Sequence, residues 1–89
     1  MAQPIRILWS EDPDEDVVAH IAEHGVRPEE ADEVISRYFD EREPSRAQTG
    51  RWVVQGFTRH GRFLVVVFDY YEAEELVIPV TAYEPHERG

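Results

Sequence analysis

The chain has 89 residues and a formal net charge of −10, with 42% hydrophobic and 31% charged residues. This length suits a single domain over residues 1–89, and the composition is that of a globular rather than a disordered chain. The chain has no cysteine, which excludes disulfides and thiolate zinc sites. Without a long apolar stretch or a basic leader, we expect a cytoplasmic protein that does not enter a membrane.

Apolar residues alternate with other residues near the start of the chain, and this period predicts a strand over about 4–9. An acidic turn follows. In that turn Asp12 can cap a helix and Pro13 suits its first position, while Gly25 suits the left-handed residue after its end. The sequence therefore predicts a short first helix over about 13–24.

Pro28 opens a second helix, predicted over about 28–39, whose apolar residues recur at helical spacing. We expect two of these residues, Val34 and Ile35, to be buried. Residues 40–50 are polar and predict a loop, and the polar tail from 84 to 89 predicts a frayed end.

The C-terminal half is rich in β-branched and aromatic residues and predicts three strands. The first two, over 52–58 and 63–71, are joined by a turn in which Gly61 can supply a positive φ. The second strand is apolar on both faces and is expected at the sheet centre. The last, over 76–82, contains Pro79, which favours an edge-facing or irregular position. The predicted fold is α+β with the order β-α-α-β-β-β, an antiparallel sheet with both helices on one face.

Between residues 44 and 68 the chain has four arginines and no acid, in contrast to the acidic segments on both sides. We call these arginines together with His60 the basic island: Arg46, Arg51, Arg59, Arg62 and His60. Such a cluster can hold an RNA phosphate and stabilise charge during phosphoryl transfer. The alternative is that scattered arginines keep the strand edges soluble.

Aromatic residues alternate with the arginines here, and Trp52 follows Arg51 directly. Proteins that bind single-stranded nucleic acids stack bases on such rings. Aromatic residues in strands equally form the core, so both interpretations of Trp52 remain open.

The segment from His20 to His24 satisfies the H-x-x-E-H motif of inverted zincins. The expected helix ends at Gly25, and no third ligand stands out, although a catalytic zinc needs one. We therefore expect two histidines near a helix end, and neither a metal nor another cofactor.

Three segments resemble BrnT-like toxins of type II toxin–antitoxin systems, whose fold is similar to RelE. The segments are 23–34 (EHGVRPEEADEV), 51–58 followed by 61–67 (RWVVQGFT and GRFLVVV), and 77–82 (VIPVTA). The resemblance implies a RelE-like fold and a small, metal-independent ribonuclease held inactive by a partner antitoxin, often a DNA-binding protein. On this view we expect Arg51, Arg62 and His60 to take part in catalysis and Arg59, Trp52 and Arg46 to bind RNA.

Two expected basic residues are missing: Glu23 stands where the family has lysine, and Tyr83 where it has arginine. Because one preorganised donor is worth about 10²–10³ in rate, an impaired member is an alternative. The other alternative is a non-catalytic module whose acidic helical face and exposed sheet edge bind a protein partner or a second copy.

Overall fold

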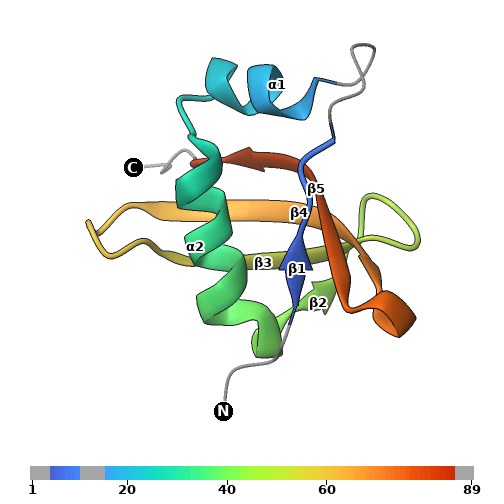
Figure 1. The fold of residues 1–89 in the computed structure, drawn as a ribbon. Coiled ribbons are helices and arrows are strands. Elements are labelled where there is room, and N and C mark those ends of the chain that lie inside the picture. Colours follow the sequence, from blue (N-terminus) through green and yellow to red (C-terminus); the bar gives the residue numbers. More distant parts are fainter. Residues whose placement is uncertain (1–4, 11–15, 86–89) are drawn as a thin grey trace.

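The computed structural model describes residues 5–10 and 16–85, which form two helices on one face of a five-stranded sheet. In Figure 1, α2 lies in front of the strands and α1 lies above them. The described residues thus have the α+β architecture that the sequence predicts. No helix among them is long and apolar enough to cross a membrane.

Helix α1 spans Val17–Glu23, and its first turn is capped by Asp16, whose carboxylate accepts a hydrogen bond from the Ala19 N–H at 3.1 Å. The helix ends at a left-handed Gly25 with φ of +77°, as predicted. The proposed start signals, Asp12 and Pro13, lie outside the described residues.

Helix α2 spans Pro28–Tyr38, close to the predicted 28–39, and Pro28 occupies its first turn. A 3₁₀ turn, η2, continues it over Phe39–Glu41. This turn and a short strand lie inside 40–50, so the prediction of a loop across that whole segment was wrong. The segment is polar and its strand has only two residues. Neither its composition nor its periodicity therefore indicates that it pairs with another strand.

The strands are β1 (Arg6–Ile7), β2 (Glu43–Pro44), β3 (Trp52–Phe57), β4 (Phe63–Tyr71) and β5 (Leu76–Tyr83). Their order across the sheet is β1-β5-β4-β3-β2, which confirms the central position of the most apolar strand. A 3₁₀ turn, η3 (Glu72–Glu74), joins β4 to β5.

The sheet is mixed. Among the described strands the predicted antiparallel pairing holds for three of the four pairs and fails for β1. Strand β1 runs parallel to β5, with Arg6 opposite Leu76 and Ile7 opposite Val77. The other pairs are antiparallel. Between β1 and β5 the chain forms both helices and the antiparallel strands. This long connection allows β5 to lie beside β1 and run parallel to it.

Two local irregularities follow the sequence signals. Gly61 turns the β3–β4 hairpin with φ of +86°. Pro79 lies opposite Phe68, next to a register shift in the β4–β5 ladder, where a missing N–H is tolerated. The predicted irregular position of Pro79 is therefore confirmed.

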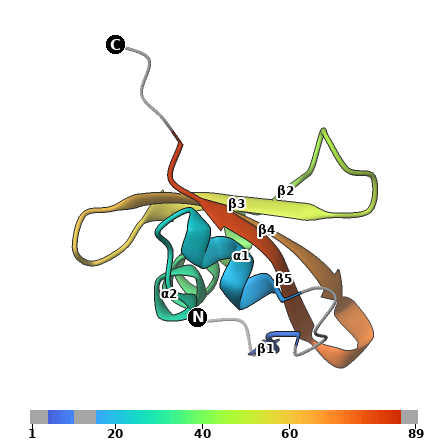
Figure 2. The ribbon, with the colours of Figure 1, turned by 90° about the horizontal axis from the view of Figure 1, so that it is seen from above.

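The core lies between the helices and the sheet, and Figure 2 shows both helices below the same face of the strands. Val34 and Ile35 are fully buried, as predicted, together with alternate residues of the central strands. The other members of this core are Ile21, Val26, Ala31, Phe39, Val54, Leu64, Val66, Phe68, Val77 and Ala82.

Side chains that alternate with these core residues point to the opposite side of the sheet. Within residues 5–10 and 16–85, no helix covers that side (Figure 2). We call it the open face, formed by Arg6, Leu8, Val53, Gln55, Phe57, Phe63, Val65, Val67, Asp69, Tyr71, Leu76, Ile78 and Thr81.

Candidate functional site

The basic island is divided between the two ends of the β3–β4 hairpin. Arg51 immediately precedes β3, where Trp52 pairs with Phe68, whereas Arg62 lies beyond the pair formed by Phe57 and Phe63. Strands rise about 3.3 Å per residue, so about 20 Å of sheet separates the two arginines. The fold does not bring them onto one phosphate.

Arg62 is held between two carboxylates. Its Nη1 lies 2.9 Å from Glu30 Oε1, and its Nε lies 3.1 Å from Glu84 Oε1. Burial alone would lower the pKa of Arg62, but the hydrogen bonds that its guanidinium donates to Glu84 and Glu30 outweigh burial, and the pKa is raised. The guanidinium is therefore charged and already occupied by two carboxylates of its own chain.

Arg51 is paired in a similar way on the open face. Its Nε lies 3.1 Å from Asp69 Oδ1, and its Nη1 contacts the side-chain oxygen of Gln48. Arg46 is exposed in the loop between β2 and β3. Arg46 and Arg51 thus lie near one end of the hairpin, and Arg59, His60 and Arg62 lie at its turn.

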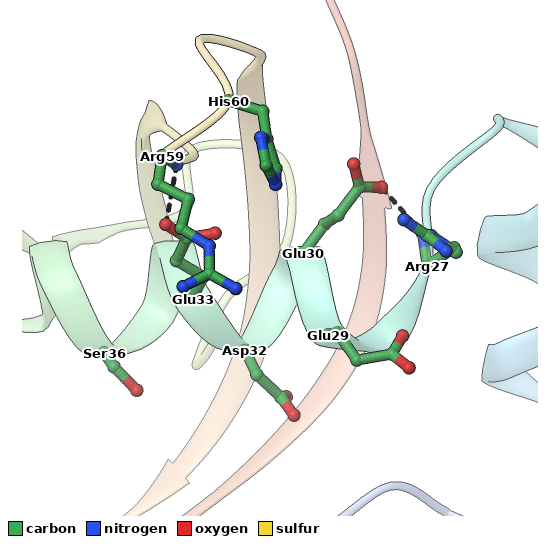
Figure 3. A pocket seen from close by; sticks show the side chains of 8 residues that line it. All are labelled: Arg27, Glu29, Glu30, Asp32, Glu33, Ser36, Arg59 and His60. Atoms are coloured by element: carbon green, nitrogen blue, oxygen red, sulfur yellow. Dashed lines mark hydrogen bonds between the residues drawn. The ribbon is translucent and has the colours of Figure 1, made fainter.

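Arg59 and His60 lie over helix α2, at the mouth of an open pocket of about 410 Å³. In Figure 3 the side chain of His60 projects from the hairpin turn and lies between Arg59 and Glu30. The main-chain N–H of Arg59 donates to Glu33 Oε2 at 2.6 Å, which fixes the turn to the helix. The pocket is lined by Arg27, Glu29, Glu30, Asp32, Glu33, Ser36, Arg59 and His60.

The lining of this pocket has four acids and two arginines, so it is negative with His60 neutral. Glu30 stays ionised: burial alone would raise its pKa, but hydrogen bonds from the Arg27 N–H and the Arg62 guanidinium outweigh this and lower it. A negative surface repels phosphate. The pocket suits a positively charged group better than RNA.

Asp32 behaves differently from Glu30 although both lie on α2. Burial raises the pKa of Asp32, and the neighbouring charge of Glu29 adds to the rise. The Trp9 indole N–H donates to Asp32 Oδ1 at 2.9 Å, which opposes the rise and ties the end of β1 to α2. Asp32 is therefore a structural partner of Trp9.

Trp52 packs against the core on the helix side of the sheet. The guanidinium of Arg42 lies 5.2 Å from its ring centroid, and 4.2 Å and 5.0 Å from those of Phe39 and Tyr70. One face of this aromatic group is thus covered by a cation of the same chain. A base could stack there only by displacing Arg42.

His20 and His24 are exposed on α1, with ring centroids 5.1 Å apart in an edge-to-face arrangement. The ring of Tyr83 lies 6.4 Å from that of His24. Residues 5–10 and 16–85 contain no group of three or more potential ligands for a metal ion.

The outer edge of β3 is closed at Phe57. Its N–H donates to the Tyr38 hydroxyl at 3.2 Å, and its carbonyl accepts from Arg37 Nη1 at 3.0 Å. An added strand would have to break both bonds. The edge is therefore protected against strand pairing at this point.

Sequence reasoning missed the carboxylates that pair with arginines of the island: Glu30, Asp69 and Glu84. Glu30 precedes Arg62 by 32 residues, and Glu84 follows it by 22. No local spacing rule links residues so far apart.

Comparisons of the chain with family models, with curated proteins and with solved structures find no match.

Proposed function

We propose that the protein is a partner-binding member of the BrnT-like toxin group of type II toxin–antitoxin systems, with a RelE-like fold and an impaired ribonuclease site. The family assignment depends on the sequence resemblance. The element order, with two helices between β1 and the C-terminal strands, agrees with what the resemblance implies. On this account the protein binds another protein and does not cleave RNA.

The observation that carries the loss of cleavage is the position of Arg62 between Glu30 and Glu84. Metal-independent RNA cleavage depends on cations placed where negative charge develops. Here Arg62 is neutralised by two carboxylates, and Arg51 is about 20 Å away along the strand. The two missing family cations, at Glu23 and Tyr83, act in the same direction.

Expression in bacteria tests this proposal. Cells that produce the chain alone should grow at the rate of empty-vector cells and keep intact RNA. An adjacent gene should encode a small DNA-binding protein, and when that protein is produced with the chain, the two should elute together in size-exclusion chromatography. Growth arrest with degraded RNA would overturn the proposal, and so would separate elution of the two proteins.

A matched variant strengthens the experiment. Glu23→Lys with Tyr83→Arg restores the two cations that the family resemblance implies, at positions that are exposed. If impairment explains the absence of toxicity, cells that produce this variant should grow more slowly than cells that produce the wild type. The variant Glu72→Lys with Ala73→Arg makes the same changes of charge at the exposed turn η3, and should leave growth unchanged.

A further inference from the structure

We propose that the open face is the docking surface for a cationic, amphipathic segment of a partner protein. This inference rests on the proposed function, since it assigns the surface through which the chain binds its partner. The surface differs from the pocket on α2, because it lies on the other side of the sheet from both helices (Figures 1 and 2).

The open face carries most of the exposed apolar bulk of the described residues. Leu8 is 54% exposed, Phe57 52% and Tyr71 48%, and all three lie on this face. Leu8 and Ile78 line a hollow at the β1 side, together with Trp9 and Ser10. The three side chains lie at the margins of the face, around Val65 and Val67, which are 8% and 9% exposed at its centre. The half-buried Val53, Phe63 and Ile78 lie between them and make this side of the sheet largely apolar, as an interaction surface is.

The charged residues of the open face indicate which kind of partner it would bind. Glu41 and Glu43 line a hollow of about 230 Å³ with Val53 and Gln55 at the β2 side. Arg51 and Arg6 lie on the same face. Arg51 is paired with Asp69, and Arg6, opposite Leu76, lies at the β1 edge, across the sheet from this hollow. A segment with apolar residues for the sheet and a Lys or Arg for the hollow would match both features.

A second copy of the chain fits less well, because it would bring another formal charge of −10 to the interface. Pairing along the β3 edge also fits less well, since Tyr38 and Arg37 occupy the Phe57 backbone groups. The partner is therefore expected across the face of the sheet.

The test titrates the ¹⁵N-labelled full chain with a short synthetic peptide in which leucine alternates with lysine. Amide shifts should concentrate at Val53, Gln55 and Val67 and leave α2 unchanged. A counterpart peptide of leucine and glutamate should not bind. Shifts centred on the α2 pocket would overturn the proposal, as would concentration-dependent shifts of the open face without peptide, which indicate a second copy as occupant.

Matched variants separate docking from general attraction. Phe57→Ser and Leu8→Ser should each weaken binding about tenfold, the loss expected for one anchoring side chain. Val18→Ser changes an exposed residue of α1 and should have no effect. Glu41→Gln with Glu43→Gln should weaken binding more than Glu23→Gln with Glu29→Gln, which removes the same charge from the helices. Equal weakening by the two charge variants would refute the surface.

Failure of this inference can be told apart from failure of the proposed function. RNA degradation in expressing cells would refute the function, whatever the peptide does. If single-stranded RNA moves the same open-face amides at physiological salt while the cationic peptide does not, the face binds nucleic acid, and the docking proposal is wrong.

Discussion

The ring of Tyr38 lies directly on Gly56: a Cβ added at that glycine would be 2.1 Å from the ring. The same tyrosine accepts the Phe57 N–H through its hydroxyl. One side chain of α2 thus uses the absence of a side chain in β3 to approach the strand and close its edge. This relationship fixes the helix to the end of the sheet next to the turn that carries Arg59, His60 and Arg62.

Gly56→Ala should therefore destabilise the fold by about 1–3 kcal/mol, the usual cost of overpacking a filled site. Urea denaturation measures this change. Replacing Tyr38 by Leu should remove most of the additional cost of Gly56→Ala, so the two substitutions should be strongly non-additive. Additive effects in the double-variant cycle would contradict direct contact as the cause.

Ile35→Ala should cost about 2–5 kcal/mol in unfolding free energy, because the side chain is fully buried between α2 and the sheet. The exposed Val18 provides the control, and its change to Ala should cost far less. A melting temperature unchanged by Ile35→Ala would contradict the packing described above.

Two carboxylates of α2 should act oppositely on stability in acid. The pKa of Glu30 is lowered in the folded state, so its contribution is present above the unfolded pKa and lost as pH falls through the folded one. The pKa of Asp32 is raised, so the folded state takes up its proton first and gains stability as pH falls.

Below about pH 5, where carboxylates begin to titrate, Glu30→Gln should make the loss of stability with falling pH shallower. Asp32→Asn should make it steeper. Denaturation midpoints across a pH series measure both slopes, with Glu74→Gln on the exposed turn as the control. The same change of slope in both variants would show that the assignments are wrong.

Zinc should not be retained, although the sequence contains H-x-x-E-H. Elemental analysis after incubation and desalting is expected to show far less than one zinc per chain. If about one zinc stays bound and is lost in the His20→Ala, His24→Ala variant but not in His60→Ala, two histidines of α1 hold a metal.

The fold was predictable where signals are local. Pro28 and Gly25 mark the helix ends, and the apolar run in β4 indicates its central position. The parallel pairing of β1 and the short strand β2 were not predictable, because two-residue strands depend on neighbours that are distant in sequence.

The candidate site was less predictable than the fold. A segment with four arginines and no acid reads as basic, yet Asp69 and Glu30 reach two of these arginines in the folded chain. Sequence order also places Arg51 near Arg62, whereas the hairpin holds them at opposite ends. Charge counted along the chain therefore did not give the charge of the surface.

The most direct test of the account is RNA cleavage by the purified wild-type chain, measured over a salt series beside the Arg51→Ala, Arg62→Ala double variant. The account predicts no cleavage by either protein at any salt concentration. Cleavage by the wild type that falls steeply with salt and is lost in the double variant would contradict it, because the basic island would then form a working phosphate site.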